Sequence, residues 1–147
     1  MIYRQGFCKW KECGAFLYAK NNFKITNDTL GHSFGDQLIV EVGNRISTLF
    51  QGKNDVFRLG EDEFIVLGCG ISMMGEIEES AKRIIQSLRA PFYIMDSIVY
   101  VTVSIGIAIY PNHGESPDEL LKCADIALYQ AKNAGKNKYV VYSNEMQ

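Results

Sequence analysis

The chain has 147 residues, a length that fits one domain of ordinary size. Hydrophobic residues make up 47% and charged residues 22%, so the chain can bury a core and is not a disordered protein. The formal net charge of -2 argues against a nucleic-acid-binding protein, which normally carries a basic domain or stripe.

Hydropathy and cysteine usage indicate a cytoplasmic protein. No apolar run approaches the ~18 residues that a membrane-spanning helix needs, and residues 1–10 lack the apolar core of a signal peptide. No two cysteines have the two-residue gap of a zinc knuckle, so we expect reduced thiols rather than a zinc site or a disulfide scaffold. The cysteines are Cys8, Cys13, Cys69 and Cys123.

The first half of the chain contains three predicted strands and one predicted helix. A short apolar run predicts a buried strand over residues 15–19. Apolar residues at helical spacing then predict an amphipathic helix over 35–50. Two β-like runs at 55–59 and 64–67 flank residues 60–63, which carry three carboxylates and predict a hairpin turn.

The second half adds two helices and three strands. A helical pattern covers 77–88, and β-branched residues predict a strand pair at 92–95 and 98–110, around a turn at Asp96-Ser97. Ser116 is a typical N-cap for a third helix, which we expect to end at a glycine. A last strand is predicted at 139–142. No linker or repeat interrupts the order, so we expect an α+β layer sandwich of the split βαβ type with a mostly antiparallel sheet.

Three polar clusters are candidate sites, and each has two interpretations. The acidic turn at 58–64 is either solvated, which local sequence favours, or neutralised by a divalent cation. The polar string at 22–36 is either a ligand-binding loop or a turn in which Asp36 caps a helix dipole. The lysines at 131–137 either interact with the dipole of the preceding helix or bind a polyphosphate.

Five motifs together resemble the ordered motif series of the GGDEF domain, the diguanylate cyclase family of bacterial cyclic di-GMP signalling. The resemblance covers about residues 16–142. It implies a central five-stranded sheet with flanking helices, as in nucleotidyl cyclase and palm domains. It also implies a GGDEF-type domain over 15–147, preceded by a diverged or truncated segment over 1–14. The motifs are FKITNDTLGHSFGD, RLGEDEF, SIGIAIYP, ADIALYQAK and GKN.

The resemblance implies a chemistry as well, in which each of two facing GTP molecules attacks the α-phosphorus of the other through its 3′-hydroxyl. It places the guanine at Asn27 and Asp36, where a carboxylate can accept from the N1–H and the 2-amino group together. His32 would border the nucleotide. The residues implied to contact the triphosphate are Phe23, Lys24, Lys132 and Lys136.

The implied metal site departs from the family pattern at two positions. The resemblance assigns Mg²⁺ to Asp62 and to the backbone carbonyl of Lys20, and it counts Asp62 and Glu63 as catalytic. The family's first metal-binding aspartate is replaced by Ala19, which offers no oxygen. Glu61 replaces the second glycine of the signature and adds negative charge beside an anion. Both changes weaken the binding of metal and phosphate.

These departures lead to a leading hypothesis and two alternatives. The leading hypothesis is a degenerate, catalytically weak or inactive GTP-binding or regulatory module. We expect it to work as a homodimer or beside a sensor or phosphodiesterase domain, without nucleic acid. The first alternative is an active diguanylate cyclase that condenses two GTP to cyclic di-GMP and two pyrophosphates. The second is a structural domain that binds no nucleotide. Residues 51–55 lack the Arg-x-x-Asp motif, so product inhibition at that site is not expected.

Overall fold

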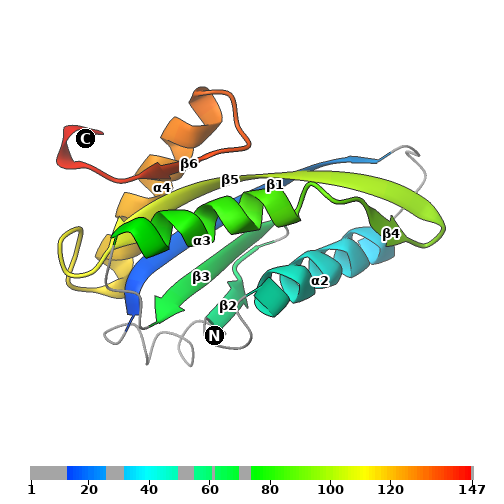
Figure 1. The fold of residues 1–147 in the computed structure, drawn as a ribbon, viewed down its shortest axis with the longest axis horizontal. Coiled ribbons are helices and arrows are strands. Elements are labelled where there is room, and N and C mark those ends of the chain that lie inside the picture. Colours follow the sequence, from blue (N-terminus) through cyan, green and yellow to red (C-terminus); the bar gives the residue numbers. More distant parts are fainter. Residues whose placement is uncertain (1–12, 26–31, 50–54, 61, 70–73, 147) are drawn as a thin grey trace.

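The computed structural model describes residues 13–25, 32–49, 55–60, 62–69 and 74–146 (Figure 1). The fold is mixed α+β, which confirms the predicted class. The strands are β1 (Cys13–Ile25), β2 (Asp55–Arg58), β3 (Glu63–Cys69), β4 (Phe92–Ile94), β5 (Ser97–Ile109) and β6 (Tyr139–Val141). The helices are α2 (His32–Leu49), α3 (Met74–Ser87) and α4 (Pro117–Asn133), followed by a 3₁₀ turn at Asn144–Met146.

The strands form one sheet that is mostly antiparallel. Five strands follow a single path in the order β2-β3-β1-β5-β4, and every neighbouring pair on it is antiparallel. The sixth strand, β6, lies off this path and pairs with β5 in parallel. The long strands β1 and β5 lie at the centre and are paired along almost their whole length (Figure 1).

Helices cover both faces of the sheet, which gives two hydrophobic clusters. On one face, α2 and α3 pack on side chains such as Leu17, Ala19 and Phe64. On the other face, α4 packs on side chains that include Tyr18 and Ile65. Because successive residues of a strand point to opposite faces, Tyr18 and Ala19 contribute to different clusters. This alternation determines which side chains reach each side of the candidate site.

Strand β1 is longer than the sequence predicts. The prediction ended the strand at residue 19, whereas the structure pairs residues 15–25 with β5 as far as Ile25 opposite Val99. The polar composition of residues 20–25 is typical of a loop. Strand β5 is long and rich in β-branched residues, so it offers these residues a pairing partner, and tertiary pairing overrides local propensity. Phe23 and Lys24 therefore lie in a strand, opposite Val101 and Tyr100.

Two element boundaries also differ from the prediction. Helix α2 begins at His32, three residues before the predicted start at 35. The β4–β5 turn consists of Met95 and Asp96, with φ values of 49° and 66°, and not of Asp96-Ser97. Two residues with positive φ are the geometry of a type I′ turn, which matches the twist of a two-stranded hairpin.

The start of α4 confirms the predicted cap. The Ser116 Oγ accepts a hydrogen bond from the Glu119 backbone N–H at 3.2 Å. At the other end, Gly135 adopts a φ of 115° after the C-cap, as predicted for the glycine that ends this helix. Gly106 of β5 lets α4 approach the sheet, since a Cβ there would lie 2.0 Å from the Ala124 carbonyl oxygen. Cys123 of α4 is a buried free thiol.

Candidate functional site

The segment from Arg58 of β2 to Glu63 of β3, called the signature turn, joins the two strands as a hairpin. The Leu59 N–H donates to the Glu63 carbonyl at 2.9 Å, and the Arg58 Nε donates to the Gly60 carbonyl at 2.9 Å. These bonds hold the turn from both sides, as the sequence predicts for the acidic segment between the two strands. Asp62 is half-buried in the turn and has an interaction of its own. Glu61 lies outside the described residues.

Glu63 is held by a residue that the sequence analysis did not assign to the site. The Tyr18 hydroxyl donates a hydrogen bond to the Glu63 Oε2 at 2.5 Å. The β1–β3 register makes this contact possible, because Lys20 lies opposite Glu63 and Tyr18 points to the same face two residues earlier. Burial raises the pKa of Tyr18, and the hydrogen bond and the charge of Glu63 raise it further. Tyr18 therefore stays a neutral donor.

The other oxygen of Glu63 lies against the backbone of the turn. A Cβ on Gly60 would be 2.9 Å from the Glu63 Oε1, so glycine at this position lets the carboxylate lie close to the main chain. One oxygen thus contacts Tyr18 and the other approaches Gly60. One feature of the sequence could have indicated this contact, because a tyrosine in a buried strand normally needs a hydrogen-bond partner for its hydroxyl. It did not show which residue that partner is.

The residue predicted to stand at the family's first metal-ligand position, Ala19, is buried. Ala19 is 0% exposed, and its cross-strand partner is Phe64. Both belong to the apolar cluster beneath α2 and α3. Among the described residues, no group of three or more His, Cys, Asp or Glu side chains is placed to hold a metal ion. The side chains that the structure describes around this turn do not fit a full Mg²⁺ ligand set.

Asp36, which is predicted to bind the guanine, lies beside the signature turn. The Asp36 Oδ1 on α2 lies 3.6 Å from the Arg58 Nη2 at the end of β2. The two side chains are 70% and 39% exposed, respectively, so the pair contributes little to stability. The ion pair instead shows where Asp36 lies, because it connects this predicted substrate-binding residue to the turn that carries Asp62 and Glu63. Arg58 was not predicted as a site residue.

The two lysines predicted for the triphosphate lie at the end of α4. Lys132 is in the last turn, half-buried, and makes an interaction of its own. Lys136 follows the helix with a φ of 63°, and its N–H donates to the Ala131 carbonyl at 3.0 Å. Helix α4 lies on the same face of the sheet as Tyr18, and the charge of its Asp125 contributes to raising the pKa of Tyr18.

The remaining predicted site residues are described in part or not at all. Asn27 lies outside the described residues. The backbone of His32 begins α2, and the backbones of the others lie in β1. The structure thus brings together Asp36, the signature turn and Glu63, and leaves the nucleotide-binding roles as predictions. The residues placed by their β1 backbone alone are Lys20, Phe23 and Lys24.

No helix among the described residues is both long and apolar enough to cross a bilayer.

Known proteins resemble this chain over almost its whole length. The sequence model of the family described as "Diguanylate cyclase, GGDEF domain" matches residues 8–138, and it begins inside the segment that the sequence analysis set apart as 1–14. The chain is 43% identical over 129 residues to Signaling protein YkoW of Bacillus subtilis, covering 87% of this chain and 16% of that protein. It is 40% identical over 126 residues to Cyclic di-GMP phosphodiesterase PdeR of Escherichia coli, covering 86% of this chain and 19% of that protein.

Solved structures show the same fold. The GGDEF domain of YfiN or TpbB from Pseudomonas aeruginosa superposes with a TM-score of 0.80 at 33% identity, covering 95% of this chain and 88% of that one. An EAL/GGDEF domain protein from M.capsulatus superposes with a TM-score of 0.76 at 32% identity, covering 95% and 98%. The chain spans less than a fifth of the length of YkoW and PdeR.

Proposed function

Since this chain belongs to the GGDEF family of cyclic di-GMP signalling proteins, we propose that it is a degenerate member that binds GTP weakly and regulates an attached or associated partner. Domains of this family bind GTP, generally use Mg²⁺, and often dimerise or adjoin other domains. The members include cyclases and domains within phosphodiesterases.

The burial of Ala19 is the observation that carries the proposal. Mg²⁺ needs near-octahedral oxygen coordination, and it usually takes one or two carboxylates together with phosphates and water. Ala19 presents a methyl group, fully buried in an apolar cluster. Asp62 would be the remaining carboxylate ligand beside the Lys20 carbonyl, and Glu61 adds charge that repels phosphate.

Glu63 supports the same conclusion from the other side of the turn. Its carboxylate already accepts the Tyr18 hydroxyl and lies close to Gly60. A carboxylate that abstracts a proton from a substrate hydroxyl needs that hydroxyl within hydrogen-bond reach. Here one of its oxygens already accepts a hydrogen bond from the protein, so Glu63 is less available to accept a proton from a substrate hydroxyl.

Nucleotide recognition is the part of the family chemistry that this chain retains. Asp36 is exposed on α2, and its contact with Arg58 is long and open to solvent, so a guanine can displace it at small cost. We assign the guanine to Asn27 and Asp36, with His32 beside it. The phosphates are assigned to the four residues that the motifs suggest, which are Phe23, Lys24, Lys132 and Lys136.

The relatives suggest the setting in which such a module works. MucR of Pseudomonas aeruginosa is named a bifunctional diguanylate cyclase/cyclic di-GMP phosphodiesterase, and PdeR a phosphodiesterase. We propose that residues 15–147 act as a cytoplasmic domain that pairs with a second copy or adjoins a phosphodiesterase domain. GTP bound to this domain then regulates the partner and is not converted to product.

Two measurements on the purified chain test the proposal. With GTP and Mg²⁺, we expect cyclic di-GMP formation at least ~100-fold below that of an active cyclase assayed alongside, since a carboxylate ligand is missing. Calorimetry is expected to show binding of GTP that Asp36→Asn weakens, because the guanine donor pair needs the Asp36 carboxylate. Product formation at the rate of the active enzyme would establish the alternative of a working cyclase. Absence of heat with GTP would leave a structural domain.

A further inference from the structure

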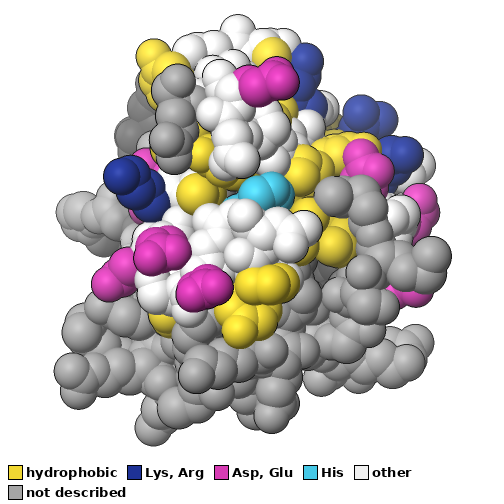
Figure 2. Space-filling view, turned by 90° about the vertical axis from the view of Figure 1, so that its left-hand side faces the viewer, with side chains coloured by type: hydrophobic (Ala, Val, Ile, Leu, Met, Phe, Trp, Pro, Cys, Tyr) yellow, Lys and Arg dark blue, Asp and Glu magenta, His cyan; other side chains and the backbone are white. Residues whose placement is uncertain are grey.

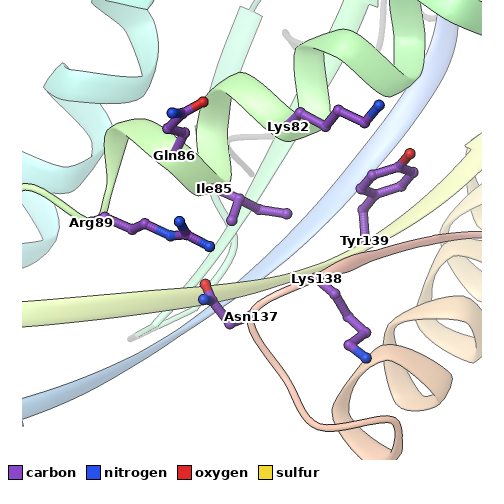
Figure 3. Close-up of a pocket in the computed structure, with 7 residues that line it drawn as sticks. All are labelled: Lys82, Ile85, Gln86, Arg89, Asn137, Lys138 and Tyr139. Atoms are coloured by element: carbon purple, nitrogen blue, oxygen red, sulfur yellow. The ribbon is translucent and has the colours of Figure 1, made fainter.

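A cavity of about 380 Å³ lies between α3 and the segment that leads into β6 (Figure 3). None of the described residues that were assigned to the GTP site lines it. Its wall on α3 is one helix face, since the lining positions are spaced by three or four residues. The residues on which the inference depends are Lys82, Ile85 and Gln86 of α3, Arg89 in the turn after that helix, and Asn137 and Tyr139 opposite.

Two cations, one on α3 and one in the turn after it, give the cavity its charge. Lys82 of α3 and Arg89, two residues beyond the end of that helix at Ser87, are both exposed and line the cavity. Lys138 also lines the cavity, but its Nζ donates to the Ala134 carbonyl at the end of α4 and points away from the other two (Figure 3). The guanidinium of Arg89 is a planar donor suited to a phosphate, and Lys82 supplies a second point charge.

Two acidic side chains of α3, Glu78 and Glu79, border the cavity. Burial raises the pKa of Tyr139, and these two side chains raise it further. Among the described residues, no Asp or Glu lines the cavity itself. The nearby carboxylate of Glu78 accepts the Tyr139 hydroxyl at 3.0 Å and is held by it. The connection into α4 carries Glu115, Asp118 and Glu119, all exposed, and several acidic side chains are visible on the face shown in Figure 2. The cavity is therefore a local positive site on a chain whose net charge is -2.

Asn137 supplies an acceptor that the protein leaves open. Its Oδ1 is shielded from solvent and has no hydrogen-bond donor among the described residues. The residue has a φ of 51°, a conformation that asparagine tolerates better than most residues. A shielded acceptor without a donor is costly, and a bound ligand that donates to it removes that cost.

We propose that this cavity binds a small organic phosphate that also carries a hydrogen-bond donor. The phosphate binds the Arg89 guanidinium, and a hydroxyl or amino group of the ligand donates to the Asn137 Oδ1 beside it. Lys82 of α3 adds a second positive charge at the other end of the cavity (Figure 3). The side chain of Ile85 and the ring of Tyr139 form an apolar floor against which the carbon skeleton packs. The volume is at the lower end of small-molecule sites and fits a molecule of mononucleotide size.

This site is separate from the GTP site proposed above. It lies against α3 and β6, whereas the signature turn joins β2 and β3. None of Asp36, Asp62 and Glu63 lines it. Loss of GTP binding would therefore leave this proposal standing, and the reverse also holds.

Calorimetric titration of the full chain with AMP tests the proposal. AMP carries a phosphate, a planar base and several donors, and its adenine lacks the donor pair that suits Asp36. We expect saturable binding of AMP, weaker binding of inorganic phosphate, and none of adenosine. Absence of AMP binding would overturn the proposal. Adenosine binding as tightly as AMP would overturn the role given to the two cations.

Variants locate the binding. Arg89→Gln is expected to weaken AMP about tenfold, the usual loss for one charge-assisted hydrogen bond, and Lys82→Gln is expected to weaken it less. Lys122→Gln removes an equally exposed lysine from α4 and is expected to change nothing. Asn137→Asp keeps the shape but adds a negative charge, so it is expected to abolish binding. Equal losses in the Lys82 and Lys122 variants, or full binding in Asn137→Asp, would refute this location.

Discussion

The Tyr18 hydroxyl and the Glu63 carboxylate, 45 residues apart in the chain, form a hydrogen bond that joins β1 to the signature turn. The bond crosses the same strand pair that places Ala19 opposite Phe64. One residue of β1 thus contacts the last carboxylate of the signature, and the next presents a methyl group at the position predicted for a metal ligand. The weak catalysis proposed for this chain depends on these two adjacent positions.

Replacing Tyr18 by phenylalanine measures the strength of this bond. Tyr18→Phe leaves the ring in the α4 cluster but removes the donor from a part-buried carboxylate, so we expect a loss of about 2 kcal/mol in the free energy of unfolding. Tyr139→Phe is the matched control, because its hydroxyl also donates to a carboxylate, that of Glu78, at 3.0 Å. That bond lies nearer the surface and is expected to contribute about 0.5 kcal/mol. Urea unfolding followed by circular dichroism gives both values, and equal losses would contradict the role assigned to Tyr18.

Restoring the missing carboxylate tests the metal assignment. Ala19→Asp together with Glu61→Gly places an acid in an apolar cluster, and an unpaired buried charge destabilises a domain by several kcal/mol. Mg²⁺ is expected to reverse this loss if Asp62 and the restored residue share the ion. The readout is the unfolding temperature with and without Mg²⁺, or recovery of the folded circular dichroism signal if the variant is unfolded without metal.

Ala81→Asp is the control for this experiment. Ala81 is also 0% exposed and belongs to the same cluster, but it lies on α3. Its variant should lose similar stability and show no response to Mg²⁺. A metal response in both variants, or in neither, would mean that the ligand assignment at Ala19 is wrong.

The contact between α4 and β5 should tolerate no side chain at Gly106. A Cβ there would lie 2.0 Å from the Ala124 carbonyl oxygen and 2.4 Å from the Leu128 backbone nitrogen, and neither backbone atom can move without shifting the helix. We expect Gly106→Ala to cost about 3 kcal/mol or more. Gly35→Ala on α2 meets nothing within 4 Å and should stabilise by up to about 1 kcal/mol. Thermal unfolding of the two variants separates these signs, and a stable Gly106→Ala would contradict the packing described.

The sequence predicted those parts of the fold that depend on local periodicity. Leu38, Val42 and Ile46 recur at helical spacing, and all three are 0% exposed on the inner face of α2. The hairpin at the signature was predicted for a similar reason, since short apolar runs flank a polar turn. Such patterns are visible because each lies within one element.

The parts that could not be predicted depend on pairing between distant strands. The polar residues after 19 are typical of a loop, and only the length of β5 shows that Phe23 and Lys24 continue the strand. The Tyr18–Glu63 bond likewise depends on the β1–β3 register, which no local pattern specifies. The same applies to the cavity beside Arg89 and Asn137, whose walls come from elements about 50 residues apart in sequence.

Acid should destabilise the domain through His113, which must be neutral to make its contacts. Its Nδ1 accepts the Ile109 backbone N–H at 2.8 Å, its ring packs edge-on against Tyr142, and burial lowers the pKa of His113 below 6.5. In the unfolded chain the imidazole binds its proton near pH 6.5, whereas the folded protein binds it only at lower pH. The unfolded state therefore binds more protons in this interval, and stability falls as the pH is lowered below about 6.5.

His113→Asn removes the titrating group and is the variant that isolates this effect. We expect it to lose about 1 kcal/mol at pH 8, because the Ile109 N–H loses its imidazole acceptor. Between pH 8 and pH 5.5 the wild-type protein should lose stability while the variant changes less, because the variant lacks the imidazole whose pKa is lowered on folding. Urea unfolding at several pH values measures both slopes. Parallel slopes in the two proteins would show that His113 does not couple folding to pH.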